Sequence, residues 1–194
     1  MRLAHVEGAV LVGGASSRMG RDKASLPWHG VPMAQRVAAS LRTCVARVRA
    51  VVRPGMAPPP GLEPIEDRYP ARAALVGVHA ALDACEAPAV LVAACDLPEI
   101  EPRVLLLLLG LVPVVGGADI VAAAGPKGPE PLLAVYRRRL LPEIGRRIES
   151  EQLSLRGLLA ASDTLLVPEQ DLRRADPELR SFRNVNRPLE IPTT

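Results

Sequence analysis

A glycine-rich segment with fixed charges is the part of the sequence best suited to chemistry. It runs from Leu11 to Lys23 and reads LVGGASSRMGRDK. Glycines let the backbone approach a ligand closely and point amide N–H groups at phosphate oxygens, while Arg18 and Lys23 add positive charge and Ser16 can donate a hydrogen bond. The order of residues differs from a Walker A loop and from the dinucleotide pattern G-x-G-x-x-G. The segment predicts a triphosphate site, and the alternative is a glycine-rich turn with solvated charges.

Two aspartates outside the glycine segment, Asp96 and Asp67, are candidates for the carboxylates that a nucleotide enzyme needs. Asp96 comes just after the apolar run Ala89–Ala94 and is followed by Leu97-Pro98. Magnesium prefers one or two carboxylates together with phosphate oxygens and water, so an aspartate at a strand end suits a hard cation. The alternative for Asp96 is a helix cap. Asp67 sits in a charged stretch that, on its chemistry alone, fits a solvated turn.

Strand-like and helix-like segments alternate along the chain, which is typical of an α/β fold with a mostly parallel sheet. The strands are expected at Val6–Val12, Val48–Val52, Ala89–Ala94, Asp119–Ala123, Leu132–Tyr136 and Thr164–Val167. The helices are expected at Pro32–Val45, Leu75–Cys85, Glu101–Leu109, Pro142–Ser150 and Leu155–Ala161. We expect a proline-rich loop at Pro54–Pro64 and an extended end at Phe182–Asn186. Ligands of such sheets bind beyond the carboxyl ends of the strands, where the glycine segment begins.

Composition excludes several classes of protein. Aromatic residues make up 2% of the chain and the net charge is only +3, so base stacking on nucleic acid is not expected. Three cysteines without a C-x-x-C pair, and three scattered histidines, give neither a disulfide framework nor a zinc pattern. The longest apolar stretch, Val104–Val115, is about 12 residues against the roughly 20 of a membrane span. It is interrupted by Gly110 and Pro113 and predicts a buried helix followed by a turn. With no signal-peptide pattern at the start, we expect a cytoplasmic protein without a membrane or nucleic-acid partner.

The glycine segment resembles the N-terminal signature of the molybdenum-cofactor guanylyltransferases, which is roughly L-x-G-G-x-S-x-R-M-G-x-D-K-x-x-L. The matching residues are Leu11, Gly13, Gly14, Ser16, Arg18, Met19, Gly20, Asp22, Lys23 and Leu26. The related cytidylyltransferases usually carry Ala-Ala-Gly where this chain has Val-Gly-Gly. The resemblance implies a single nucleotidyltransferase domain over residues 1–194, a Rossmann-like three-layer αβα fold similar to glycosyltransferase-A enzymes.

Later landmarks continue the resemblance to about Ile191. The stretch around Asp96 resembles the family's Cys-Asp-x-Pro pattern, which implies that Asp96 binds Mg²⁺. Glu130–Tyr136 resembles a Pro-Leu-x-Ala-x-Tyr strand. The resemblance implies that the pterin is bound by Arg156, in a late Ser-Leu-Arg helix, and by Asn184 and Asn186, in an Asn-x-Asn-x-Pro ending. The alternatives are a surface arginine on a helix and an Asx turn.

The implied reaction transfers GMP from GTP to the terminal phosphate of molybdopterin or its molybdenum form, with release of pyrophosphate. The implied catalytic residues are Lys23, Arg18 and Asp96. The implied nucleotide-binding residues are Leu11, Val12, Gly13, Gly14, Ser16, Gly20, Lys23, Asp67 and Asp96. Mg²⁺ is the implied cofactor, and molybdoenzymes or their chaperones are the implied protein partners.

Two positions depart from the family pattern. Ala73-Ala74 stands where the family usually has Gly-Pro, ahead of Leu75 and Gly77, and Val52 stands where a nucleotide-contacting Asn is usual. Three other functions are therefore kept open. They are a cytidylyltransferase for the same pterin, a sugar-phosphate nucleotidyltransferase, and a GTP-binding chaperone that delivers cofactor without catalysis.

Overall fold

The core of the molecule is a central sheet whose strands follow the apolar runs of the sequence. The structure, a computed structural model, describes residues 5–12, 23–114 and 117–185. In this part of the chain the strands of the sheet are β1 (Val6–Leu11), β4 (Val48–Val52), β5 (Glu63–Glu66), β6 (Ala89–Ala94), β7 (Ile120–Gly125), β8 (Gly128–Arg137) and β9 (Thr164–Val167). They lie in the order β5-β4-β1-β6-β8-β7-β9. Only β8 is antiparallel to its neighbours, which confirms the prediction of a mostly parallel sheet.

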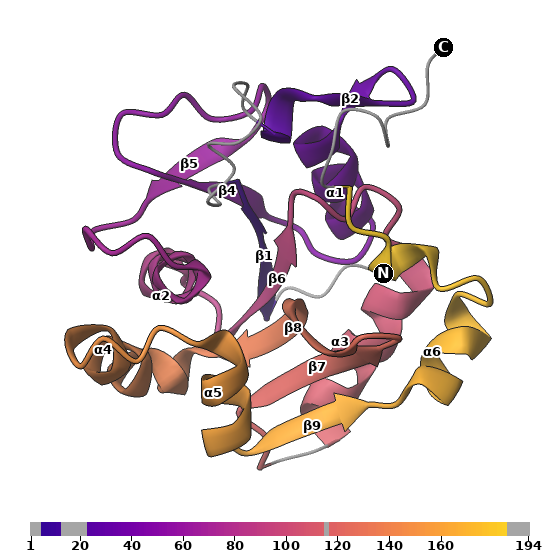
Figure 1. The fold of residues 1–194 in the computed structure, drawn as a ribbon. Coiled ribbons are helices and arrows are strands. Elements are labelled where there is room, and N and C mark those ends of the chain that lie inside the picture. The colour runs from indigo at the N-terminus through magenta and orange to yellow at the C-terminus, as the bar shows by residue number, and fades with distance from the viewer. Residues whose placement is uncertain (1–4, 13–22, 115–116, 186–194) are drawn as a thin grey trace.

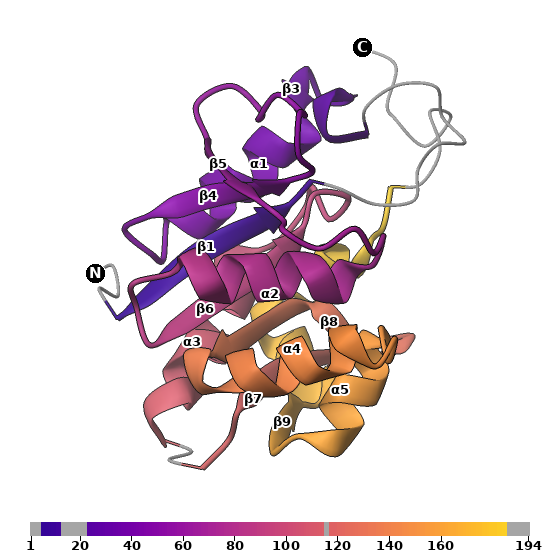
Figure 2. The same cartoon turned by 90° about the vertical axis from the view of Figure 1, so that its left-hand side faces the viewer.

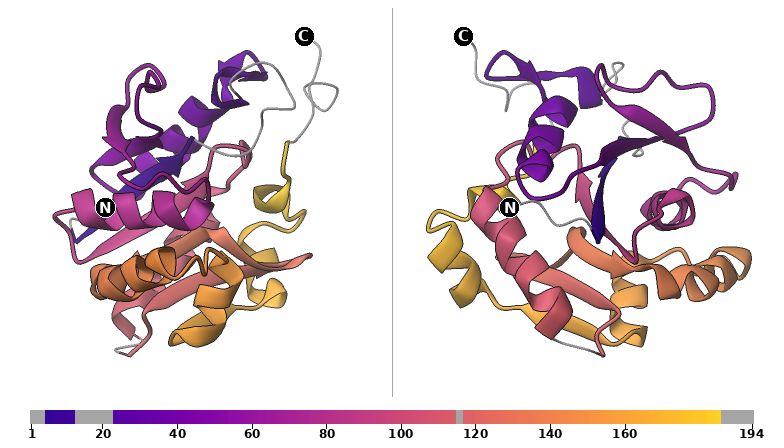
Figure 3. Two further views of the ribbon diagram at one scale, coloured as in Figure 1. Left: turned by 60° about the vertical axis from the view of Figure 1, so that its left-hand side comes forward. Right: turned by 180° about the vertical axis from the view of Figure 1, so that it is seen from behind.

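Helices cover both faces of the sheet, which gives the three-layer αβα architecture (Figures 1 and 2). The α-helices in the described residues are α1 (Met33–Arg42), α2 (Ala74–Ala84), α3 (Pro102–Val114), α4 (Leu141–Glu149), α5 (Leu155–Ala161) and α6 (Glu169–Ala175). One apolar cluster joins the sheet to α1, α3 and α6, and a second joins it to α2, α4 and α5. Side chains alternate between the faces of a strand, so Val10 of β1 belongs to the first cluster and Ala9 and Leu11 to the second. Figure 3 shows the two helical layers from the side and from behind.

The helix α3 is longer than the sequence predicts. The expected helix stops at Leu109, with a turn at Gly110 and Pro113, whereas the observed helix continues to Val114. The helix thus includes both Gly110 and Pro113, although a proline removes one backbone hydrogen bond to the preceding turn. At 13 residues α3 is the longest of the described helices, and none of them has the length and apolarity needed to cross a membrane.

Several short elements are absent from the sequence-based expectations. The strand β5 lies at the end of the stretch predicted as a proline-rich loop, and α6 was not expected at all. A small antiparallel hairpin pairs β2 (Pro27–Trp28) with β3 (Val31–Pro32). The residues between them, His29 and Gly30, have φ angles of 47° and 77°, as a two-residue turn of type I′ requires.

The end of the described chain also differs from the prediction. Phe182 belongs to a 3-10 helix, η4 (Arg180–Phe182), and is not extended. Leu179, with φ of 51°, enters this turn in the left-handed region, and the Phe182 amide donates to the Leu179 carbonyl at 3.1 Å. Asn186 lies outside the described residues.

A buried ion pair ties the start of β1 to its neighbour β4. Arg49 Nη2 lies 2.9 Å from Glu7 Oε2, and both side chains are about nine-tenths buried. Glu7 Oε1 also accepts from the backbone N–H of Glu86, and Arg49 donates to the carbonyl of Ala84 at 2.7 Å. The pair therefore connects β1, β4 and the segment that leads into β6.

We predict that Glu7→Gln lowers the free energy of unfolding by about 3 kcal/mol, because it leaves the Arg49 charge buried without its counter-charge. The matched control is Glu63→Gln, which removes the partner of Arg47 in an exposed pair at 3.0 Å and is expected to cost less than about 1 kcal/mol. Urea denaturation of the three proteins measures both effects. Equal losses for the two variants would contradict the structural role of the buried pair.

The Glu7–Arg49 pair also makes the free energy of unfolding depend on pH. Burial alone would raise the pKa of Glu7, but the backbone N–H groups of Glu86 and Ala87 and the Arg49 charge together lower it below its ordinary value of 4.5. The stabilisation from the Glu7 charge is therefore complete above pH 4.5 and is lost as pH falls through the lowered pKa. The stability difference between the wild-type protein and Glu7→Gln should shrink in that acidic range and stay constant above it.

Candidate functional site

The ends of β1 and β6 lie side by side at one edge of the sheet. Leu11 and Ala94 are register partners in this parallel pair, and the Cys95 amide donates to the Leu11 carbonyl at 3.1 Å. On the other side of β1, the Val12 amide donates to the Val51 carbonyl at 3.0 Å. The glycine segment therefore begins beside the end of β6, the strand that Asp96 follows.

Most of the glycine segment lies outside the described residues. The predicted positions there are Gly13, Gly14, Ser16, Arg18 and Gly20. Leu11 and Val12 are described and are buried. Lys23 begins the 3-10 helix η2 (Lys23–Ser25), while its side chain lies outside the described part of the chain. The roles of these residues stay predictions, and the structure fixes only where the segment starts and where it returns.

Asp96 is joined to the end of the chain by a backbone hydrogen bond. The Val185 amide donates to the Asp96 carbonyl at 2.9 Å, and Val185 is buried. This bond brings Asn184, which is half-buried, to the same strand end as Asp96, although 88 positions separate the two residues in the numbering. Two of the predicted site residues are thus brought together, and Asn186 lies outside the described residues.

Glu130 is a site residue that the sequence reasoning missed. The β6–β8 ladder ends with Ala93 paired to Leu133, and because the two strands are antiparallel, the residues after β6 and those at the start of β8 lie toward the same edge of the sheet. Burial raises the pKa of the half-buried Glu130, and the negative charge of Asp96 raises it further. The only sequence signal was a charged residue at the start of the strand that contains Leu132–Tyr136. The structure therefore adds a second carboxylate beside Asp96.

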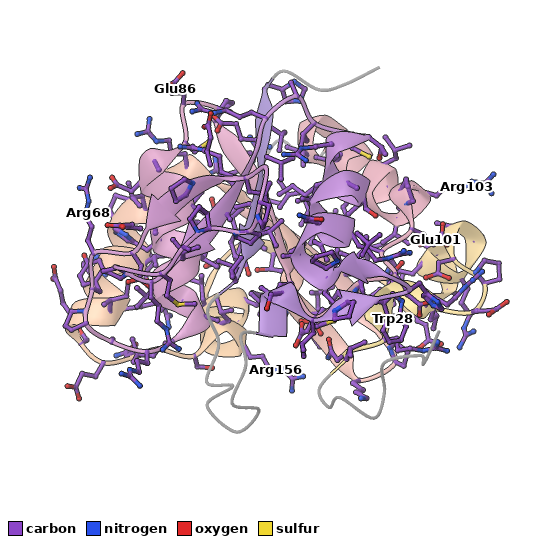
Figure 4. All side chains as sticks on the ribbon, turned by 90° about the horizontal axis from the view of Figure 1, so that it is seen from above. Trp28, Arg68, Glu86, Glu101, Arg103 and Arg156 are labelled. Carbon is purple, nitrogen blue, oxygen red and sulfur yellow. The ribbon has the colours of Figure 1, made fainter. Side chains whose placement is uncertain are left out.

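Arg156 stands near this carboxylate pair at the start of α5. The Ser154 side chain caps the helix by accepting from the Gly157 amide at 3.1 Å. Arg156 is exposed, donates to the Lys127 carbonyl at 3.4 Å, and its positive charge lowers the pKa of Glu130. Figure 4 shows Arg156 on the side of the molecule opposite Glu86, which precedes the first residue of β6. Arg156 is thus placed on the carboxyl side of the sheet.

Asp67 lies at the same edge but several strands away. It follows β5, which is parallel to β4, and its amide donates to the Val52 carbonyl at 3.2 Å. Three strand spacings separate β5 from β6, or roughly 14 Å at the usual 4.8 Å spacing. Burial raises the pKa of the Asp67 carboxyl, Arg53 lowers it and Glu66 raises it again. Asp67, the predicted nucleotide contact, and Asp96, the predicted metal ligand, therefore lie at well-separated points of the same edge.

The two departures from the family pattern have a structural account. The Val52 side chain is 1% exposed and belongs to the core, so it offers no side-chain hydrogen bond at the edge. In the other departure, Ala73 precedes α2 without a side-chain cap. The retained Gly77 allows close packing, because a Cβ there would lie 2.6 Å from Leu11 Cδ2 and the Leu11 side chain would have to move. The helix can therefore approach the end of β1 closely.

The donor set fits a divalent cation that is also bound by a substrate. No group of three or more His, Cys, Asp or Glu side chains gathers in residues 5–12, 23–114 or 117–185. Asp96 and Glu130 provide two neighbouring carboxylates, and Mg²⁺ typically takes one or two from the protein and the rest from phosphates and water. The site therefore suits a metal that arrives with a nucleotide better than a metal held by the protein alone.

The pKa of Glu130 tests this arrangement in two directions. We predict that Asp96→Asn lowers the pKa of Glu130, because a neighbouring negative charge is removed, and that Arg156→Gln raises it, because a positive charge is removed. Carbon-13 NMR titration of the Glu130 side-chain carboxyl measures both shifts without substrate. Shifts of the same sign in the two variants, or none in either, would contradict the placement of these three side chains.

Comparison with known proteins agrees with this geometry. The model of the MobA-like NTP transferase domain matches residues 8–170. A probable molybdenum cofactor guanylyltransferase of Deinococcus radiodurans is 33% identical over 183 residues, which cover 94% of this chain and 90% of that protein. A molybdenum cofactor guanylyltransferase of Desulfosudis oleivorans is 30% identical over 96% of this chain and 92% of its own length.

Solved structures support the same assignment. The molybdopterin-guanine dinucleotide biosynthesis protein A of Archaeoglobus fulgidus superposes with a TM-score of 0.80 at 28% identity, covering 95% of this chain and 94% of its own. A 2-C-methyl-D-erythritol 4-phosphate cytidylyltransferase of Thermus thermophilus reaches a TM-score of 0.66 at 16% identity over 98% and 96% of the two chains, a likeness of fold alone. The glycine segment, the strand-end aspartate and the match across most of the chain lead to one conclusion: this protein belongs to the MobA-like NTP transferase family.

Proposed function

We propose that this protein transfers GMP from GTP to the terminal phosphate of molybdopterin, or of its molybdenum form, with release of pyrophosphate. The observation that carries the proposal is the pairing of Leu11 with Ala94, which sets the start of the glycine segment beside Asp96. The similarity to guanylyltransferases over more than nine-tenths of the chain supports the choice of substrates. The proposed unit is the whole chain as one domain. None of the three cysteines, all of which are described, forms a disulfide, which supports the proposal of a cytoplasmic enzyme.

The triphosphate of GTP is proposed to bind the glycine segment. Leu11 and Val12 would fix the start of the segment through the sheet, and backbone amides at Gly13, Gly14, Ser16 and Gly20 would donate to phosphate oxygens. Such amides are preorganised donors that need no rearrangement during the reaction. Arg18 and Lys23 would neutralise the charge that develops on the departing pyrophosphate. The reaction is then a direct displacement at the α-phosphorus by an oxygen of the pterin phosphate, without a side-chain nucleophile.

Asp96 is the proposed ligand of a divalent cation, for which Mg²⁺ is the choice. The cation supplies charge neutralisation and orientation of phosphate oxygens when it is bound. Asp96 holds its position by two neighbours, since its strand end is bonded through Cys95 to Leu11 and its own carbonyl accepts from Val185. Glu130 adds negative charge beside it and would favour the cation over an empty site.

The pterin is proposed to approach from the side of β8 and the chain end. Arg156 would bind its phosphate, and Asn184 and Asn186 would bind its ring system. Support comes from the Val185–Asp96 hydrogen bond, which brings Asn184 to the strand end where the reaction would occur. Arg156 lies near Glu130, which links it to the same place.

Guanine is proposed to be read mainly by backbone groups near β4 and by Asp67. The buried Val52 side chain removes the asparagine contact that the family usually has. The same strand end still presents a half-buried carboxylate, because the Asp67 amide is bonded to the Val52 carbonyl. A carboxylate can accept two hydrogen bonds from an N–H-rich base edge.

The substrate choice is tested by pyrophosphate release from the purified protein with Mg²⁺ and molybdopterin. We expect release with GTP and none above background with CTP or ATP, because base selection is part of the proposed activity. Omission of molybdopterin is the control for nucleotide hydrolysis. A preference for CTP would overturn the base assignment, and GTP binding without release would favour a cofactor-delivery chaperone.

Site variants test the residues. Lys23→Ala and Asp96→Asn are each expected to lower kcat by on the order of 10²–10³, the usual effect of removing one preorganised electrostatic group. Asp163→Asn is the matched control for Asp96, because Asp163 precedes its strand β9 and so lies at the opposite edge of the sheet. Circular dichroism establishes that each variant is folded. Near-normal turnover of folded Lys23→Ala and Asp96→Asn would refute the site assignment.

A further inference from the structure

The single tryptophan of the chain carries a buried donor without an acceptor. Trp28 lies in the β2–β3 hairpin and is 4% exposed. Its indole Nε1 is one of two buried side-chain nitrogens in the described residues that have no hydrogen-bond partner. The other is Arg49 Nε, whose guanidinium is already held by Glu7 and Ala84. The indole has only one donor, so Trp28 is left with no compensating bond.

This orphan donor is placed against the chain end that reaches the proposed reaction centre. Trp28 forms a small apolar cluster with Met33 and Val185, separate from the two main clusters. Val185 is the residue whose amide donates to the Asp96 carbonyl. Figure 4 shows Trp28 and Arg156 on the same side of the molecule, away from Glu86. Trp28 therefore packs against Val185, the residue that follows Asn184, on the carboxyl side of the sheet.

Packing alone does not account for a tryptophan at this position. A buried N–H without an acceptor costs about 1–3 kcal/mol, and a Phe or Leu would fill the same apolar cluster without that cost. The backbone around the hairpin is held by the Met33 amide, which donates to the Leu26 carbonyl at 2.9 Å, and the exposed His29 ring lies edge-on to the indole at 5.2 Å between ring centroids. A buried donor without a partner calls for an explanation, and a functional role in which a ligand supplies the acceptor is one.

We infer that the Trp28 indole N–H donates to an acceptor atom, an oxygen or a ring nitrogen, of the pterin substrate. The inference rests on the proposed function and adds a binding residue to it. The pterin is chosen over GTP because Trp28 packs against Val185, which in the sequence lies between Asn184 and Asn186, the asparagines proposed to bind the pterin. The proposed guanine contacts lie elsewhere, at β4 and β5. The donor would gain its missing bond only when the substrate is bound.

The first test uses the fact that one tryptophan gives one indole signal. In protein labelled with ¹⁵N-tryptophan, addition of molybdopterin alone should move the indole ¹H resonance downfield, as a new hydrogen bond requires. Addition of GTP with Mg²⁺ alone should leave it in place. A signal that moves with GTP and not with molybdopterin, or with neither, would overturn the inference while leaving the pyrophosphate assay free to support the proposed function.

The second test is kinetic and uses Trp28→Phe, which keeps an aromatic ring and removes the N–H. The KM for molybdopterin should rise about five- to tenfold, which corresponds to one hydrogen bond, while the KM for GTP and the melting temperature change little. His29→Gln, which retains the indole and removes the ring beside it, is the matched control and should leave both KM values unchanged. A molybdopterin KM within twofold of the wild-type value in folded Trp28→Phe would overturn the inference. If that variant does not fold, the NMR titration of the wild-type protein decides.

Discussion

Leu11 and Ala94 are register partners at the carboxyl ends of β1 and β6, and the rest of the site depends on this pairing. In a parallel sheet every strand delivers its following residues to the same edge, so two segments far apart in the sequence start from neighbouring points. Here one strand is followed by a glycine-rich segment and the other by Asp96. The Cys95 amide donates to the Leu11 carbonyl at the end of this pair, so the proposed phosphate-binding segment and the proposed metal ligand Asp96 begin side by side.

The antiparallel strand β8 contributes residues to the proposed site that precede the strand's buried part, which a parallel strand would place at the opposite edge. Because it runs against β6, its amino-terminal residues reach the carboxyl edge, and Glu130 lies near enough to Asp96 for that charge to raise its pKa. The same edge also receives Arg156 from α5 and Asn184 from the chain end. Burial and a like charge both raise the pKa of Glu130 and the nearby cations lower it, so the edge carries charges of both signs. A substrate with phosphates and a divalent cation would satisfy both signs at once.

The sequence predicts this architecture well where local patterns are strong, and poorly where contacts between residues far apart in the sequence determine the structure. The strands β4 and β6 and the helix α5 were predicted with the observed bounds. Glu130 was missed because its proximity to Asp96 comes from the antiparallel placement of β8 beside β6, which no local pattern encodes. The hairpin at Trp28 was missed because its strands are two residues long and its turn uses His29 before glycine instead of the commoner Asn or Asp. The short strand β5 was hidden by Pro64 within it and by the proline-rich stretch before it.

The joined ends of β1 and β6 are the proposed centre of nucleotidyl transfer. A crystal of the protein grown with a non-hydrolysable GTP analogue and Mn²⁺, with the cation located by its anomalous scattering, tests this directly. We expect one strong peak within coordination distance of the Asp96 carboxylate and of phosphate oxygens, with the triphosphate along the glycine segment. A cation bound at another edge of the sheet, or a triphosphate remote from Asp96, would contradict it.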